Sequence, residues 1–328
     1  MSGRTAGLEA EDPLPTVEEP MPRTRDSLEP GTYIDCYRIV ETIGKGGFSL
    51  VYLAEDDETG DEVVIKEFMP KRLARRGPNN YLVPLENGRR ESLLRSRKLF
   101  FQEARTMASL RHPHIVAVLN CFIANDTAYI VMQHERGRNL GQLIHQRGHL
   151  STTLILRIFL PLLDALALMH ARSMLHLDLK PGNIHLRTGH DPLLLDLGAV
   201  HLMDNSDSSS QVITAGYSPP EQYKHGGAIG PWTDVYAIGA SLRCCLEGKT
   251  PQPSPERVID DKLLPAVTEL GDRYPAWLLE LIDWSMQLDP ESRPRNAGEV
   301  LAVMRAHDTA AGDSAQRDAA PPAPSPPP

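Results

Sequence analysis

The stretch His176-Leu177-Asp178-Leu179-Lys180-Pro181-Gly182-Asn183-Ile184 places an acid, a base and an amide in one short loop. Eleven residues after its amide begins Leu194-Leu195-Asp196-Leu197-Gly198, which adds a second carboxylate. Phosphoryl transfer requires a carboxylate that orients the attacking hydroxyl, oxygen ligands for Mg²⁺ and a cation for the developing charge. Each residue alone would suit an ordinary surface loop, but together and in this order they indicate phosphoryl-transfer chemistry. The groups of the required types are Asp178, Lys180, Asn183 and Asp196.

A glycine-rich loop lies upstream, between two segments that alternate apolar and polar residues as strands do. Glycine has no Cβ, so a glycine backbone can approach a phosphate closely. A strand rather than a helix follows the loop, which argues against a dinucleotide-binding fold. Taken alone, the loop could equally be a plain hairpin turn. The loop and its flanks are Ile43-Gly44-Lys45-Gly46-Gly47-Phe48-Ser49-Leu50-Val51.

A lysine ends the next apolar segment, Val63-Val64-Ile65-Lys66. Buried lysines are rare unless they are paired, so Lys66 could neutralise phosphate charge if a carboxylate fixed its position. Glu103 is the best candidate, because it shares the apolar face of a predicted helix. Glu91 is the rival, but its neighbourhood is crowded with arginines and favours a solvated helix residue.

The period of the apolar residues changes along the chain. In the first third they alternate with polar residues, which is typical of strands, and one helical period interrupts them. Beyond about residue 137 the helical period dominates. The sequence therefore predicts an α+β fold, with a β-rich lobe over about 31–135 and a helical lobe over about 136–306. Expected strands are 37–43, 50–54, 62–68, 116–122 and 127–132, and expected helices are 99–110, 154–170, 232–246, 277–288 and 297–304.

Both ends of the chain are predicted to be disordered. Residues 1–30 are Pro-rich and acidic, and residues 307–328 end in an extended Ala- and Pro-rich run. Neither segment has enough large apolar side chains to offset the entropy lost on ordering. We therefore expect one core domain over residues 31–306.

Composition excludes several classes of protein. The 328 residues hold 34 Lys and Arg against 43 Asp and Glu, a net charge of −9, which argues against a surface built to bind nucleic acid. The N-terminus lacks a secretory signal pattern, and no apolar run approaches the ~20 residues of a membrane helix. The four cysteines and twelve histidines show no zinc-site spacing. We expect a cytoplasmic protein with reduced thiols.

Together these motifs resemble the eukaryotic-like serine/threonine protein kinases of bacteria over about residues 37–305. Gly44-x-Gly46 resembles the glycine-rich loop, Asp196-Leu197-Gly198 the metal-binding segment and Ser218-Pro219-Pro220-Glu221 the segment that shapes the peptide platform. The resemblance implies a bilobal protein-kinase-like fold with the domain boundaries given above. It also implies ATP and Mg²⁺ (or Mn²⁺) as cofactors, Ser/Thr hydroxyls of proteins as acceptors, and a role in signalling.

The resemblance implies a role for each candidate residue. Asp178 would orient the hydroxyl and accept its proton, and Lys180 would stabilise the transferring phosphoryl group. Lys66, held by Glu103, would orient the phosphates, and for His185 simple packing is the alternative to adenine contact. The implied metal ligands are Asn183 and Asp196. The implied ATP-binding residues are Ile43, Gly44, Lys45, Gly46, Gly47, Phe48, Ser49, Val51, Val64, Lys66, Met132, Gln133, Glu135 and His185.

Four further residues are implied to build the core of the helical lobe and the substrate platform. Arg293 would pair with Glu221, and Asp234 would anchor the large central helix. Thr214 lies seven residues before Glu221 and, with Lys180, favours Ser/Thr over Tyr substrates. The four residues are Thr214, Glu221, Asp234 and Arg293.

Leu177 departs from the family pattern. In the family an arginine at this position pairs with a phosphate on the activation loop. A leucine cannot pair with phosphate, so we expect activity without activation-loop phosphorylation.

An arginine-rich insertion over residues 71–98 separates Lys66 from Glu103. A solvated basic face is its plainest interpretation. Clustered guanidinium groups also recognise carboxylates and phosphates, so an acidic or phosphorylated partner could dock on the insertion. The acidic residues of the tails would also allow contact between the tails and the insertion. Its basic residues are Lys71, Arg72, Arg75, Arg76, Arg89, Arg90, Arg95, Arg97 and Lys98, against the acids Glu86 and Glu91.

Two other functions stay open. Small-molecule phosphotransferases of the aminoglycoside type also carry His-x-Asp followed by Asn, although the glycine loop, Lys180 and the Ser218–Glu221 segment argue against them. A pseudokinase, which binds and signals without transfer, is the second alternative. Leu177 points in that direction, whereas the complete set of phosphate and metal groups does not.

Overall fold

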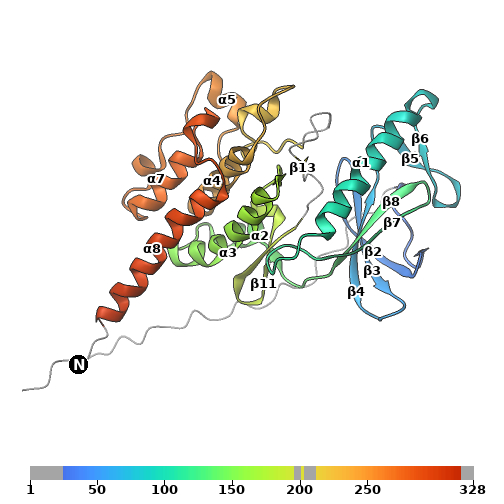
Figure 1. Ribbon diagram of the computed structural model, residues 1–328, viewed down its shortest axis with the longest axis horizontal. Coiled ribbons are helices and arrows are strands. Elements are labelled where there is room, and N and C mark those ends of the chain that lie inside the picture. The colour runs from blue at the N-terminus through green and yellow to red at the C-terminus, as the bar shows by residue number, and fades with distance from the viewer. Residues whose placement is uncertain (1–24, 196–200, 203–211, 319–328) are drawn as a thin grey trace, which may run out of the picture. The chain divides into compact units, whose positions relative to one another are not determined.

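The computed structural model describes residues 25–195, 201–202 and 212–318, and it divides into two compact units, which are coloured by residue number in Figure 1. Of the described residues, the first unit takes 25–138 and 185–193, and the second takes 139–184, 194–195, 201–202 and 212–318. The first is rich in strands and the second in helices, so the predicted α+β fold is confirmed. Residues 185–193, which the sequence predicts within the lobe of about 136–306, group with the first unit.

A six-stranded antiparallel sheet, in the order β1-β2-β3-β4-β8-β7, forms the first unit. The alternating pattern of β3 buries Leu50, Tyr52 and Ala54 on one face. The central strand β4 is buried along most of its length, as its apolar run predicts. The strands are β1 (Tyr33–Ile34), β2 (Tyr37–Lys45), β3 (Ser49–Asp56), β4 (Glu62–Phe68), β7 (Val118–Ala124) and β8 (Thr127–Gln133).

Shorter elements complete this unit. The helix of the first unit, α1 (Arg90–Ala108), lies beside a hairpin that the insertion forms (Figure 1). The sequence predicted that helix to begin about ten residues later. The hairpin is β5 (Ala74–Arg76) with β6 (Leu82–Pro84), and a small sheet has the order β12 (Asp191–Leu194), β11 (Ile184–Arg187), β9 (Arg138–Asn139).

The second unit is organised around α4 (Pro231–Glu247), in which fourteen residues are buried. A Cβ at Gly239 of this helix would lie 2.7 Å from the Ser285 Cβ, so glycine is what allows α4 to approach α7 closely. The N-cap of α3 is Ser151, whose hydroxyl accepts from the Leu154 amide. The other helices and strands are α2 (Leu140–Arg147), α3 (Thr152–Ala171), α5 (Ser254–Ile259), α6 (Ala266–Leu270), α7 (Ala276–Ser285), α8 (Ala297–Asp318), β10 (Met174–Leu175) and β13 (His201–Leu202). Short 3₁₀ turns are Pro78–Asn80, Asn87–Arg89, Pro181–Asn183, Thr188–His190, Pro220–Tyr223 and Pro290–Ser292.

The ends of the core extend beyond the predicted limits. Residues 25–30, expected to be disordered, include Leu28 at 2% exposure and Asp26, which is hydrogen-bonded to Arg76. At the other end α8 continues through Asp318, although the sequence ended the core at residue 306. His307 stacks on Trp277 with ring centroids 4.6 Å apart, which anchors the helix past the predicted boundary. The disorder predicted for residues 1–24 and 319–328 lies outside the residues that the structure describes.

Among the helices of the described chain, α3 alone is long and apolar enough to pass a length-and-composition test for a membrane span. The sequence did not predict any stretch of that kind. Eleven side chains of α3 are buried within the second unit, where it packs against α8. A buried core helix has this composition as well, so the test carries little weight.

Candidate active site

The glycine-rich segment forms the turn between β2 and β3. The Gly46 amide donates to the Ser49 carbonyl at 2.8 Å, which closes the turn. A Cβ at Gly44 would lie 3.1 Å from the Val51 Cβ, so this register leaves little room for a side chain. Phe48 at the tip is 44% exposed. The motif thus produces an exposed turn whose backbone a ligand can approach.

Backbone hydrogen bonds connect this turn to the residues after β4. The Met69 amide donates to the Phe48 carbonyl at 2.8 Å, and the Lys71 amide donates to the Gly47 carbonyl at 3.1 Å. Lys71 is the first basic residue of the insertion. The insertion therefore begins in direct contact with the glycine-rich turn.

Lys66 lies on β4 and is 7% exposed. Two residues further, on the same face of the sheet, Phe68 contacts Phe100 of α1 with ring centroids 5.3 Å apart. Glu103 lies one helical turn beyond Phe100. Burial raises the pKa of Glu103 to about 7, and the charge of Lys66 opposes that rise. The two predicted partners thus interact electrostatically, and Glu103 is mainly a carboxylate only above about pH 7.

The predicted adenine-binding residues lie at the end of β8 and just after it. Met132 is 8% exposed and pairs with Val64 of β4, while the side chain of Gln133 is exposed. Glu135 lies 3.6 Å from Arg187 in an ion pair. The sheet thus places Val64 and Met132 side by side.

His185 packs closely against the chain after β8. A Cβ at Gly137 would lie 2.6 Å from Nε2 of His185, so a glycine is needed for this contact. Burial lowers the pKa of the His185 imidazole. The close fit to Gly137 favours the packing interpretation of His185.

In the second unit three side chains converge on Asp178, which is 7% exposed. Lys180 Nζ donates to Oδ2 at 2.8 Å and to Oδ1 at 3.0 Å. The Thr214 hydroxyl donates to Oδ1 at 2.6 Å, and Asn183 Nδ2 donates to Oδ2 at 2.9 Å. Asp178, Lys180 and Asn183 come from one predicted motif and Thr214 from another, and the structure brings all four together.

Asn183 has the orientation that a hard cation needs. Its Nδ2 donates to the carboxylate and the backbone carbonyl of Asp178, at 2.9 and 2.8 Å, so Oδ1 is the amide atom left to face a metal. The Leu195 amide donates to the Asn183 carbonyl at 3.0 Å, which places the start of the second acidic motif beside it. Asp196, with Leu197 and Gly198, lies outside the described residues. The described part of the predicted metal site thus offers an amide oxygen, a ligand type that hard divalent cations take.

A fully buried carboxylate, Asp234 of α4, holds the loop that carries Asp178. It accepts from the His176 and Leu177 amides, each at 2.8 Å, and from His170 Nε2 at 2.9 Å. Burial alone would raise the pKa of Asp234, but the contacts with His170 and His176 hold it below its ordinary value. Asp234 therefore stays ionised and fixes Leu177 in the left-handed region, at φ 60°.

The predicted pair of Glu221 and Arg293 is present and buried. Its two hydrogen bonds, at 2.8 and 3.1 Å, are bidentate. Thr233 donates to the same carboxylate at 3.1 Å, and the guanidinium lies 5.0 Å from the centroid of the Tyr236 ring. The pair fixes the segment before α4 to the core of the second unit.

Two polar residues of this network were not predicted. Gln222 Nε2 donates to the Leu177 carbonyl at 2.8 Å and so links the platform to the catalytic loop. His170 accepts from the Ala297 amide at Nδ1 and therefore donates from Nε2 to Asp234. A buried position for either residue could have been suspected only from its apolar neighbours, since no motif marks it.

Comparison with known proteins identifies the pattern. The protein kinase domain matches residues 37–303. Serine/threonine-protein kinase C of Synechocystis sp. is 34% identical over 229 residues, which are 66% of this chain and 40% of that protein. Serine/threonine-protein kinase PknK of Mycobacterium tuberculosis is 32% identical over 278 residues, 81% of this chain and 23% of that protein. This chain thus spans less than half the length of these relatives. The solved structure described as "PpkA-294 apo form" has a TM-score of 0.74 and 32% identity, and covers 85% of this chain and 99% of that one.

Proposed function

The chain belongs to the protein kinase domain family, and on that premise we propose that it transfers the γ-phosphoryl group of ATP to serine and threonine hydroxyls of proteins. The observation that carries the proposal is the convergence of Lys180, Thr214 and Asn183 on Asp178. The printed names of its relatives, which are serine/threonine-protein kinases, support the class of acceptor.

In this mechanism Asp178 orients the acceptor hydroxyl and takes its proton. The Thr214 hydroxyl now occupies Oδ1 at 2.6 Å, and a substrate hydroxyl would replace that contact with the same geometry. Lys180, within 3.0 Å of both carboxylate oxygens, is placed to stabilise charge on the transferring group. When bound, ATP supplies that group and Mg²⁺ neutralises its charge, with Asn183 and Asp196 as the proposed ligands.

The residues of the first unit would bind the nucleotide. We expect Lys66 to orient the phosphates, with Glu103 as its partner, and the glycine-rich turn to cover them. Because the pKa of Glu103 is about 7, the ionised form that supports Lys66 increases as pH rises through neutrality. Val64, Met132 and the residues after β8 would line the adenine site.

A substrate-class assay tests the proposal. Incubated with radiolabelled ATP and Mg²⁺, the full chain is expected to label a serine-rich basic protein and itself, but not small aminoglycoside alcohols. Lys66→Met is the matched inactive variant and should abolish the label. Transfer to the small alcohols would instead support the small-molecule phosphotransferase, and transfer to no acceptor would support a pseudokinase.

We also propose that transfer does not depend on activation-loop phosphorylation. Leu177 is 5% exposed and cannot pair with phosphate. Its carbonyl accepts from Gln222, so a neutral hydrogen bond connects the catalytic loop to the platform. Enzyme treated with phosphatase until mass spectrometry finds no phosphate is expected to keep its initial rate within about twofold. Loss of nearly all activity on that treatment, restored by autophosphorylation, would contradict the proposal.

The thiols support a reducing compartment such as the cytoplasm. All four cysteines are free, and Cys244 and Cys245 are buried in α4. Burial raises the pKa of both thiols, which disfavours the reactive thiolate. These cysteines therefore serve as small apolar core residues.

A further inference from the structure

The arginine-rich insertion divides into an internal part and an exposed part. Arg76 belongs to the internal part, since its side chain is 7% exposed and it pairs with the fully buried Glu67 at 2.7 and 2.5 Å. Two further arginines of the insertion have partners nearer the surface. Arg97 donates to the Asp126 carbonyl at 2.8 Å, and Arg89 pairs with Glu86 at 3.0 Å. The prediction of a solvated basic face was therefore wrong for Arg76.

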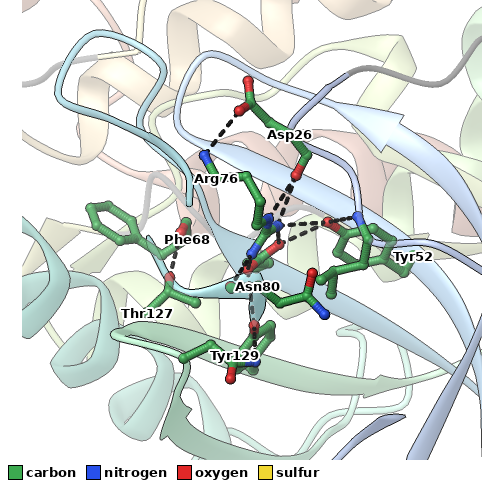
Figure 2. Close-up of polar contacts among 10 residues, drawn as sticks. Asp26, Tyr52, Phe68, Arg76, Asn80, Thr127 and Tyr129 are labelled. Atoms are coloured by element: carbon green, nitrogen blue, oxygen red, sulfur yellow. Dashed lines mark hydrogen bonds and ion pairs between the residues drawn. The ribbon is translucent and has the colours of Figure 1, made fainter. Parts of the chain in front are cut away.

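The N-terminal segment is fixed to this internal part. The backbone carbonyl of Asp26 accepts from Arg76 Nε at 3.0 Å and Nη2 at 2.8 Å, and its carboxylate accepts from the Arg76 amide at 3.0 Å (Figure 2). Leu28 is buried beside them and its amide donates to the Tyr52 hydroxyl at 3.3 Å. The described part of the chain therefore begins beside β5, at Arg76.

The exposed part of the insertion carries a set of cations, which we call the basic patch. Arg89 donates to the Arg72 carbonyl at 2.9 Å, which brings the start of α1 to the start of the hairpin. Among the described residues no carboxylate lies within 4 Å of the side chains of Arg72, Arg75 or Arg90. Unpaired clustered guanidinium groups are suited to bind carboxylates. The basic patch consists of the exposed residues Lys71, Arg72, Arg75 and Arg90.

Exposed apolar side chains accompany the patch. Leu94 lies one helical turn after Arg90 on α1 and is 43% exposed. Tyr81 and Leu85 of the hairpin are 49% and 46% exposed. A ligand that carries both acids and apolar residues would match this surface better than a purely acidic one.

The segment that the chain itself attaches here has that chemistry. Residues 8–19, LEAEDPLPTVEE, contain five acidic residues, no basic residue, and the apolar Leu8, Leu14 and Val17. Glu19 is seven residues from Asp26, and a chain of that length reaches up to about 24 Å. Such a short tether gives an effective concentration of about 1 mM, against which a free acidic ligand must compete.

We propose that residues 8–19 dock in cis on the basic patch of their own chain. The patch adjoins the Lys71–Gly47 hydrogen bond, so a docked segment lies next to the glycine-rich turn. An acidic partner protein then binds the basic patch only by displacing residues 8–19. The predicted binding of an acidic partner at this insertion is thus subject to competition from the chain's own N-terminus.

A fluorescent peptide with the sequence of residues 8–19 tests the proposal by anisotropy. The full chain should bind it weakly. A full chain with the five tail acids neutralised (Glu9→Gln, Glu11→Gln, Asp12→Asn, Glu18→Gln and Glu19→Gln) should bind it about tenfold or more tightly. Adding Arg72→Ser, Arg75→Ser and Arg90→Ser to that chain should abolish the increase in peptide affinity. This increase in affinity should also become steeply smaller as the salt concentration rises, because the contact is electrostatic and exposed.

A charge-matched control shows whether peptide binding depends on the basic patch or only on the net charge of the chain. Arg172→Ser, Lys224→Ser and Arg295→Ser remove three exposed cations from the second unit and should leave peptide binding unchanged. Equal binding to the wild-type and neutralised chains would overturn the proposal, as would binding that survives loss of the patch. A dimer that dissociates on dilution, and that the neutralised chain does not form, would show docking between copies instead. None of these measurements depends on phosphoryl transfer.

Discussion

Replacing Asp178 with asparagine is expected to lower kcat for protein phosphorylation by about 10²–10⁴-fold while ATP still binds. The carboxylate accepts from Lys180, Thr214 and Asn183, so both of its oxygens already act as acceptors in the way a substrate hydroxyl requires. An amide keeps the shape and one acceptor oxygen but cannot take the proton. Steady-state transfer rates should therefore fall, with little change in the nucleotide Kd measured by calorimetry.

A matched substitution tests whether that loss is specific. Asp272→Asn removes the same charge from an exposed position of the second unit and should leave kcat unchanged. Near-normal turnover by Asp178→Asn would remove Asp178 from its proposed role. A parallel loss of nucleotide binding would instead indicate that the substitution disturbs the fold.

The catalytic loop could be predicted from the sequence because its residues lie within one short stretch. Asp178, Lys180 and Asn183 are separated by only a few positions, so their contacts follow from local backbone geometry. Glu221 and Arg293 are 72 residues apart, yet the predicted pair formed as a bidentate contact. That success came from the family resemblance, since no spacing rule connects residues so distant.

The network around Glu67 could not be predicted for the opposite reason. Glu67 follows Lys66 on β4, and the alternation of a strand places the two side chains on opposite faces of the sheet. Nothing in the sequence distinguishes Arg76 from the other arginines of the insertion, and their abundance suggested a solvated surface. The pairing exists because the β5–β6 hairpin folds back over the sheet, which is a tertiary effect.

The sequence predicts core boundaries at residues 31 and 306 from the average composition of each end, and the ordered core extends beyond both. Residues 25–30 resemble the acidic tail that precedes them, but Leu28 and the backbone of Asp26 have partners inside the first unit. The segment after residue 306 is rich in Ala and Asp and lacks Pro until residue 321, so helix α8 can continue to Asp318. Proline content averaged over the whole end concealed that difference.

Removing Arg76 is expected to destabilise the protein by about 3–5 kcal/mol, the cost of leaving a buried charge unpaired. Glu67 is fully buried and accepts from Arg76 and from the Tyr52 and Tyr129 hydroxyls, at 2.8 and 2.9 Å for the tyrosines. Without the guanidinium, the carboxylate must be protonated or hydrated at the centre of this network (Figure 2). Burial and Glu67 both raise the pKa of Tyr52, so its hydroxyl stays protonated and donates to Glu67.

A double-mutant cycle separates the interaction energy of Arg76 with Glu67 from the cost of leaving one buried charge unpaired. Arg76→Met should be strongly destabilising, whereas Arg76→Met with Glu67→Leu should recover much of the loss, because both buried charges are then gone. Urea unfolding and Tm are measured on the full chain for the wild type, Arg76→Met, Glu67→Leu and the double variant. Arg38 and Glu55 form a half-exposed ion pair on the same sheet, and Arg38→Met should cost at most about 1 kcal/mol. Similar small costs at both sites would show that Glu67 reaches water, and that the network does not secure the N-terminal segment.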